Sequence, residues 1–227
     1  MNSLRKELYH NVDAEYAEFN RRLLPGTENI LGVRMPVLRK TASELMKENW
    51  RSFLETDSEY HEEYLLKALI VANADISFEE RIGLTRNFVP CIENWAVCDL
   101  LCNDWKYVPE ANVPLWGLCD EWLSSGEEFK MRTSVVMMLF KFIDDENIDK
   151  VLDRIASNSH DGYYYKMGAA WTLSFCYVEY PDKTENVLKS GKLNPEIQNM
   201  TVRKIRESLR VSKDDKERIK IYLRRNP

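Results

Sequence analysis

The chain has 227 residues, of which 44% are hydrophobic and 30% charged, and its formal net charge is −5. This composition is typical of a soluble globular protein and excludes a disordered chain, while the longest strongly apolar run is too short to span a bilayer. Motifs of the forms GxGxxG, GxxxxGK[ST], HExxH and GxSxG are absent, which excludes the common nucleotide-binding, zinc-protease and serine-hydrolase sites. We expect one domain over residues 1–227 that is cytoplasmic and monomeric.

The cysteines and histidines argue against a metal site. The five cysteines are an odd number without a CxxC pair, and the three histidines are scattered along the chain. We therefore expect no metal, and we expect reduced thiols that serve as small buried side chains.

Apolar residues recur at helical spacing along almost the whole chain, and no segment alternates with a period of two between hairpin turns. Proline and glycine residues separate most of the helical segments. The pattern predicts an all-α fold. In chain order, the predicted helices cover residues 2–10, 12–23, 36–48, 58–73, 77–88, 94–104, 110–124, 127–142, 145–156, 162–179, 182–190, 194–209 and 213–224.

Short polar connections require successive helices to pack as antiparallel neighbours. Pairs of roughly 35–45 residues match the period of HEAT-like repeats, although no sharp sequence repeat is visible. We expect a HEAT-like helical-repeat solenoid, a curved stack of antiparallel helix pairs. Its concave surface would be lined by one helix of each pair and would suit a long polyanion.

Trp95 and Asp99 are spaced i,i+4, which places an indole and a carboxylate on one face of a predicted helix. Val97, Leu100 and Leu101 can form the packing side of that helix, so Asp99 is expected at the edge of apolar surface. From the residues alone, an acid paired with an arginine or capping a neighbouring helix is the commoner role. The functional alternative is an anion held where positive charge develops in a reaction.

Arg132 precedes the apolar run Val135–Phe140, which suggests the exposed start of a buried helix. It could form a weak surface ion pair with Glu128 at i−4, or it could clamp a phosphate with two parallel hydrogen bonds.

One continuous stripe runs along the predicted helix 162–179, and such a stripe is more typical of core than of a cofactor site. Gly168 in mid-helix costs about 1 kcal/mol relative to alanine, so we expect a helix or a ligand to approach closely there. The stripe consists of Tyr164, Met167, Gly168, Trp171 and Phe175.

Charge is distributed unevenly along the chain. Residues 200–227 contain ten Lys or Arg against four acids, a net charge of +6 that leaves −11 elsewhere. This end is either a solvated helical terminus laced with ion pairs or a surface for a polyanion.

Five segments, in this order and spacing, resemble the AlkD-like DNA alkylation repair family over nearly the whole chain. The segments are Ile30–Arg39 (ILGVRMPVLR), Asn94–Asp99 (NWAVCD), Met131–Arg132, Tyr164–Trp171 (YYKMGAAW) and Arg203–Lys216.

The resemblance implies a HEAT-like repeat fold that holds duplex DNA. It also implies a monofunctional glycosylase, a hydrolase that removes N3- and N7-alkylated purines without a metal or other cofactor. By the same resemblance, Asp99 corresponds to the catalytic carboxylate, Trp95 and Trp171 to aromatic walls against the lesion, and Arg132 to a phosphate-contacting residue. The expected DNA-binding residues are Arg34, Arg39, Lys166, Lys204 and Arg206.

This chemistry is consistent with the residue types. Alkylation gives the purine a positive charge, so it leaves without strong acid catalysis, and cleavage builds oxocarbenium character at C1′. A carboxylate can stabilise that charge, and indole faces add cation–π attraction. The alternative is a non-catalytic HEAT-like repeat module that binds nucleic acid or protein in its concave face through the five basic residues.

Overall fold

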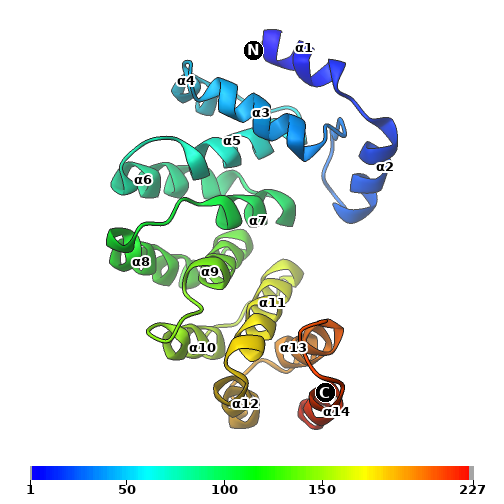
Figure 1. Ribbon diagram of the computed structural model, residues 1–227, viewed down its shortest axis with the longest axis vertical. Helices are drawn as coiled ribbons and strands as arrows, with labels where there is room; N and C mark the ends of the chain where they lie inside the picture. The colour runs from blue at the N-terminus through cyan, green and yellow to red at the C-terminus, as the bar shows by residue number, and fades with distance from the viewer. Residues whose placement is uncertain (1, 225–227) are drawn as a thin grey trace. The chain divides into compact units, whose positions relative to one another are not determined.

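The computed structural model describes residues 2–224, which form fourteen α-helices and three short 3-10 segments and contain no β-strand (Figure 1). The predicted all-α class is confirmed, and each of the thirteen predicted helices is present. The helices are α1 (Asn2–His10), α2 (Ala14–Leu23), α3 (Met35–Leu45), α4 (Trp50–Leu54), α5 (His61–Asn73), α6 (Phe78–Phe88), α7 (Trp95–Asp104), α8 (Asn112–Leu123), α9 (Glu128–Lys141), α10 (Ile148–Ser157), α11 (Tyr163–Glu179), α12 (Pro181–Ser190), α13 (Pro195–Glu207) and α14 (Lys213–Arg218). The 3-10 segments are η1 (Val89–Cys91), η2 (Pro109–Ala111) and η3 (Ile219–Tyr222).

Two differences from the predicted helices have simple causes. α4 was not predicted, because five residues are too few to display a helical period. The predicted helix 213–224 is divided into α14 and η3, whose tighter winding begins at Ile219.

The chain forms two compact units, unit 1 (Met1–Asn112) and unit 2 (Val113–Pro227). Each unit has its own stack of helices and is described by itself. That the whole chain acts as one domain stays a prediction.

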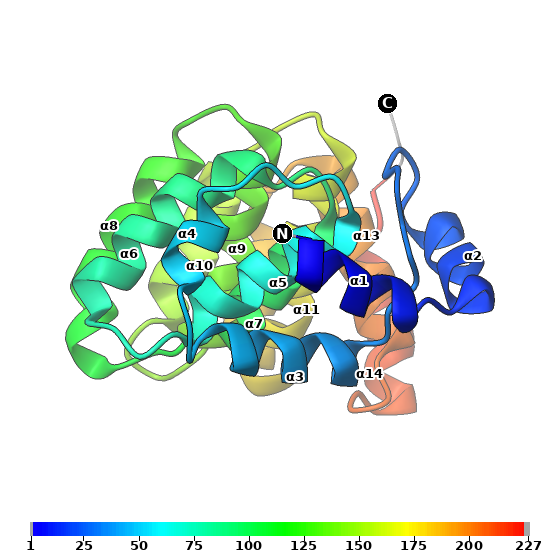
Figure 2. The ribbon, with the colours of Figure 1, turned by 90° about the horizontal axis from the view of Figure 1, so that it is seen from above.

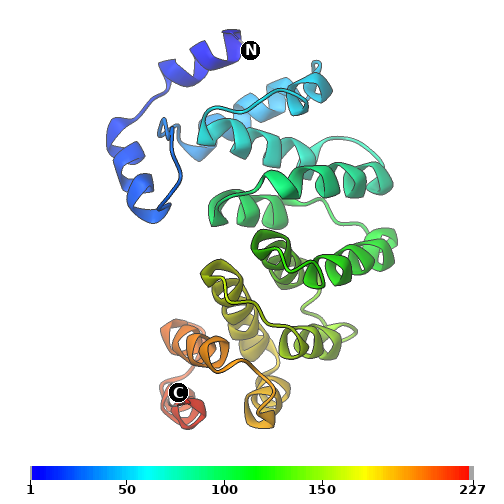
Figure 3. The ribbon, with the colours of Figure 1, turned by 180° about the vertical axis from the view of Figure 1, so that it is seen from behind.

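In unit 1, α5 packs between α3 and α7, and these three helices form one layer (Figure 3). Helices α4 and α6 also pack against α5. The segment Leu65–Ala72 is buried throughout, because its sequence LLKALIVA is apolar on almost every face. A helix with apolar residues all round belongs in the middle of such a stack.

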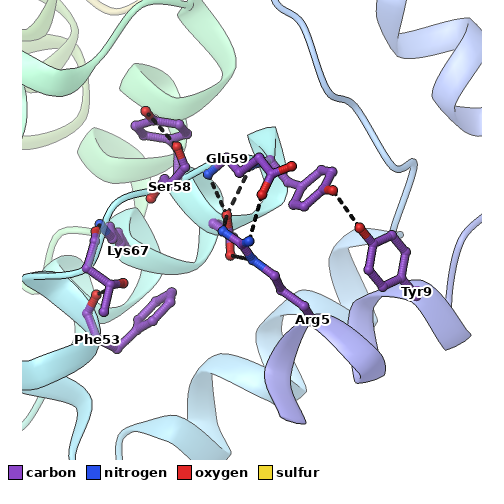
Figure 4. Close-up of polar contacts among 10 residues, drawn as sticks. Arg5, Tyr9, Phe53, Ser58, Glu59 and Lys67 are labelled. Carbon is purple, nitrogen blue, oxygen red and sulfur yellow. Dashed lines mark hydrogen bonds and ion pairs between the residues drawn. The ribbon is translucent and has the colours of Figure 1, made fainter. Parts of the chain in front are cut away.

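Helix α1, whose course Figure 2 shows at the N-terminus, is attached to α3 and α5 by polar contacts. The Arg5 guanidinium lies 2.9 Å from the Glu63 carboxylate and 2.6 Å from that of Glu59 (Figure 4). The Thr41 hydroxyl of α3 donates to the Glu7 carboxylate over 2.9 Å. These contacts fix the N-terminal helix to the stack.

Unit 2 repeats the arrangement with α11 packed between α9 and α13. Helices α10 and α12 pack against α11 and against each other, so alternate helices form two layers. Stacking of one helix from each successive pair is the mark of a helical-repeat solenoid, which confirms the predicted fold class.

Four of the five cysteines are buried free thiols and Cys91 is exposed, so the expected core role is correct for four of them. Among residues 2–224, no helix combines the length and apolar character needed to cross a membrane.

Candidate functional site

All nine site residues proposed from the sequence belong to the stacked layers. In unit 1, Arg34 and Arg39 lie at the start of α3 and on α3, and Trp95 and Asp99 lie on α7. In unit 2, the layer α9, α11 and α13 carries the others, which are Arg132, Lys166, Trp171, Lys204 and Arg206. None lies on α4, α6, α10 or α12.

The start of α7 is fixed by Asn94. Its side-chain oxygen accepts the Val97 amide over 3.1 Å and caps the helix. Its amide nitrogen lies 3.4 Å from Nδ1 of His61, and both side chains are buried. Burial lowers the pKa of His61 to about 4, so at neutral pH the ring is uncharged and its Nδ1 can accept from Asn94. This neutral pair holds the first turn of α7 against α5.

Trp95 is half-buried and anchored at its edge. Its indole Nε1 donates to the Leu23 carbonyl at the end of α2 over 3.0 Å. The ring packs on a small buried cluster of Ala17, Leu24 and Ile30. The hydrogen bond and the apolar cluster hold the indole in one orientation, and part of the ring surface remains exposed.

Asp99 lies one turn after Trp95 and is also half-buried. Val97 and Leu101 are buried on the packing side of α7, whereas Leu100 is half-buried. The expected position at the edge of apolar surface is therefore confirmed, and α7 presents the aromatic ring and the carboxylate on one side.

A buried carboxylate that the sequence analysis missed holds the loop before α3. Glu62 of α5 is 1% exposed and accepts the backbone amides of Gly32 (2.7 Å), Leu31 (3.1 Å) and Val33 (3.2 Å). Three converging amides form an anion-binding nest. The glycine between Leu31 and Val33 was a visible feature of the sequence. Its contact with Glu62 could not be predicted, because Glu62 lies about thirty positions away.

Gly32 is required by this loop for two reasons. Its φ is +84°, and an added Cβ would lie 2.3 Å from the Asp13 carbonyl oxygen. The loop therefore presses directly on the first turn of α2, the helix whose last residue accepts the Trp95 hydrogen bond.

Arg34, the residue before α3, and Arg39 on α3 both have acidic partners. The Arg34 guanidinium binds the Asp13 carboxylate with contacts of 2.7 and 2.9 Å and lies 4.6 Å from the centre of the Tyr16 ring. Arg39 pairs with Asp104 at the end of α7. Burial alone would raise the pKa of Asp104, but hydrogen bonds, first that of Arg39, outweigh it and lower the pKa.

Arg132 is 4% exposed, so the expectation that it marks an exposed helix start is wrong. Its Nη1 donates to the Tyr164 carbonyl at the start of α11 over 2.7 Å. A Cβ on Gly168 would lie 3.3 Å from Arg132 Cγ, which confirms the predicted close approach and identifies a helix as its cause. The absent side chain of Gly168 makes room for the Arg132 stem.

Glu128 binds the start of α11 in the same region. Its carboxylate accepts the amides of Tyr164 (2.5 Å) and Tyr165 (3.3 Å). A carboxylate at a helix N-terminus satisfies free amides and interacts favourably with the helix dipole. Glu128 and Arg132 together fix α11 to α9.

The stripe on α11 is not core, contrary to the commoner expectation. Tyr164 and Trp171 are half-buried and Phe175 is exposed. Trp171 makes edge contacts with Phe140 of α9 and with Phe175, with ring centres 5.8 and 6.0 Å apart. The result is an aromatic strip on the α9 and α11 layer, and Phe140 belongs to it although sequence reasoning did not select it.

The remaining basic residues differ in their surroundings. Lys166 pairs with Glu196 of α13, and its side chain is 12% exposed. Lys204 lies 3.0 Å from Glu207 one turn along α13. Arg206 is exposed. Four of the five expected DNA-binding cations thus already have carboxylate partners.

Comparison with known families identifies the family of this chain. The family model described as DNA alkylation repair enzyme matches residues 4–211. The chain belongs to the DNA alkylation repair enzyme family. The match covers both units and includes all nine site residues. Comparison with individual curated proteins gives no match. Family membership supports a role in DNA repair with DNA as the partner.

Proposed function

We propose that this family member is a monofunctional DNA glycosylase that hydrolyses the N-glycosidic bond of N3- and N7-alkylated purines in duplex DNA. The observation that carries the proposal is the pairing on α7. An anchored indole and a carboxylate lie one turn apart, and both are partly exposed.

Asp99 is the proposed catalytic residue. As the alkylated purine departs, the C1′–N bond breaks and positive charge develops on the sugar, which the carboxylate stabilises. Water then supplies the oxygen of the new C1′–OH bond and releases one proton. The purine takes the electrons of the broken bond, which neutralises its alkylation charge, so no cofactor takes part in this scheme.

The indoles of Trp95 and Trp171 are proposed walls for the damaged nucleotide. Each is half-buried and restrained by neighbours, so each offers an ordered face for cation–π attraction. Arg132 is the proposed phosphate contact. Because Arg132 is 4% exposed, such a contact would involve little of its surface.

Arg34, Arg39, Lys166, Lys204 and Arg206 are proposed to bind the phosphate backbone. Since Arg34 and Arg39 pair with Asp13 and Asp104, binding there requires exchange of a carboxylate for a phosphate. Each phosphate neutralised contributes about 0.9 to the slope of −log K against log salt concentration. We expect a clear but moderate salt dependence of duplex binding.

A second candidate function is a non-catalytic module that uses the same layer helices. The ion pairing of four of the five expected cations and the net charge of −5 weaken attraction for DNA, so they favour the form of this module that binds a protein. This candidate predicts no base release at any excess of protein.

Release of free base from duplex DNA with a single 7-methylguanine, under protein excess, tests the proposal. The parent is compared with Asp99→Asn and with Asp75→Asn, a control at an exposed carboxylate of the same unit. We expect release by the parent and by the control, and none by Asp99→Asn at a temperature where a thermal melt shows that this variant is folded. Equal release by Asp99→Asn would refute the assigned role of Asp99. No release by the parent would favour the binding module.

A further inference from the structure

A cavity of about 410 Å³ lies in unit 1 among α4, α5, α6 and the loop before α5. Leu54, Val71, Leu84 and Phe88 contribute an apolar wall. The volume falls in the range of pockets that bind small organic molecules. None of the nine site residues lines it.

Lys67 supplies a buried positive charge to this cavity. Its side chain reaches from α5 into the lining, the residue is 7% exposed, and its Nζ lies 5.7 Å from the centre of the Phe53 ring (Figure 4). Nζ donates to the Thr56 carbonyl. Across residues 2–224, no carboxylate lies within ion-pair distance of it.

Such an ammonium lacks the counter-charge that buried lysines normally have. An ammonium has three N–H donors, and only the contact to Thr56 uses one. Desolvation lowers the pKa of Lys67, and the more distant carboxylates of Glu63 and Asp57 oppose that shift without cancelling it. A ligand with a negative charge would complete the coordination of Nζ.

Ser58 supplies a second group with unused hydrogen-bonding capacity. Its hydroxyl oxygen is buried and has no hydrogen-bond partner within the described part of the chain. Tyr64 also lines the cavity, and its hydroxyl makes only a long contact of 3.4 Å to the Ser58 carbonyl. A buried hydroxyl without a partner is costly, so an acceptor on a ligand would be stabilising.

The acidic residues of the lining do not cancel the attraction of Lys67 for an anionic ligand. Glu80 is neutralised by Arg51 at 2.8 Å. Glu55 and Asp57 are exposed, so water screens their repulsion. Lys67 is the charged group of the lining that is buried.

We propose that this cavity binds a small organic carboxylate with an apolar body, whose oxygens contact Lys67 Nζ and Ser58 Oγ. The apolar body of the ligand lies against Leu54, Val71 and Phe88. This binding site is separate from the proposed glycosylase residues, so either proposal can fail without the other.

Titration with benzoate, followed by NMR of labelled protein, tests the site, and benzamide serves as the neutral analogue of the same shape. The variants are Lys67→Met, Ser58→Ala and the control Lys47→Met, which alters an exposed lysine of the same unit. We expect saturable benzoate binding to the parent and to the control. We expect benzamide to bind at least about tenfold more weakly, and Lys67→Met to weaken benzoate binding by a similar factor.

A second readout distinguishes a ligand contact from a structural role. Benzoate is expected to raise the pKa of Lys67, measured by NMR of labelled lysine, whereas benzamide is not. If Lys67→Met does not fold, Ser58→Ala still tests the site, because it removes only the hydroxyl that is proposed to contact the ligand. Equal binding of benzoate and benzamide, full binding by both cavity variants, or no binding of benzoate at millimolar concentration would overturn the proposal.

Discussion

Replacement of Glu62 by glutamine is expected to loosen the loop that leads into α3. In the parent, one carboxylate oxygen accepts Gly32 and Val33 at 2.7 and 3.2 Å, and the other accepts Leu31 at 3.1 Å. Glutamine keeps one acceptor oxygen, loses the charge, and places an amide NH₂ against the Leu31 N–H. Hydrogen bonds to a charged group are worth roughly 1.5–3 kcal/mol and are about twice as strong as neutral ones. Loss of one and weakening of two therefore removes about 3 kcal/mol from the local stability of the loop.

Hydrogen exchange of the three amides measures this change directly. A loss of about 3 kcal/mol corresponds to roughly a hundredfold faster exchange at Leu31, Gly32 and Val33. Glu48→Gln, at an exposed position of the same unit, is the control and should leave the rates unchanged. Unchanged exchange in Glu62→Gln would refute the reasoning and would show that apolar packing alone holds the loop.

Three further predictions concern buried or crowded positions. Burial lowers the pKa of His61 from 6.5 to about 4, so the unfolded state takes up a proton at a higher pH than the folded state does. The free energy of unfolding should therefore fall by about 2 kcal/mol between neutral pH and about pH 5. Denaturant titrations should show this fall in the parent and should show no such pH dependence in His61→Gln. Gly32→Ala should destabilise the fold by more than about 2 kcal/mol, because φ is positive and an added Cβ would lie 2.3 Å from a backbone oxygen. Gly26→Ala should cost about 1 kcal/mol, because φ is also positive (+85°) but no atom lies within contact distance. Thermal melts measure both costs, and equal values would contradict the argument from the contact at Gly32. Gly168→Ala should change stability by less than about 1 kcal/mol, because the gain in helix propensity opposes a small shift of the Arg132 stem, and a larger loss would show that this stem cannot move.

We expect the reaction proposed at Asp99 to depend on how firmly the indole of Trp95 is held. Its two restraints, the Leu23 carbonyl and the Leu24 and Ile30 side chains, lie in or beside the segment that Glu62 and Gly32 shape. Variants of the loop are therefore expected to disturb base release indirectly, while Asp99→Asn acts on the reaction itself. Comparison of melting temperature with release rate separates the two effects.

The sequence alone was sufficient for the helical class, for most helix positions and for the pairing of Trp95 with Asp99. Each of these depends on local rules, since hydrophobic periodicity and i,i+4 spacing are properties of a single helix. The helix α4 was missed because five residues carry no period. The close approach at Gly168 was also predicted, although the sequence did not identify Arg132 as the group that approaches.

Tertiary structure decided which side chains are buried and which charged groups form ion pairs. Arg132 is buried where α9 packs against α11, whereas Trp171 of the aromatic strip is half-buried and Phe175 is exposed. Glu62 reaches amides about thirty positions away, and Arg39 meets Asp104 across 65 positions. A helix pattern determines which side chains share a face, but the neighbour against which that face packs depends on long-range contacts. For this reason the residue types of the proposed site were visible in the sequence, whereas their supports and ion-pair partners emerged only from the packed structure.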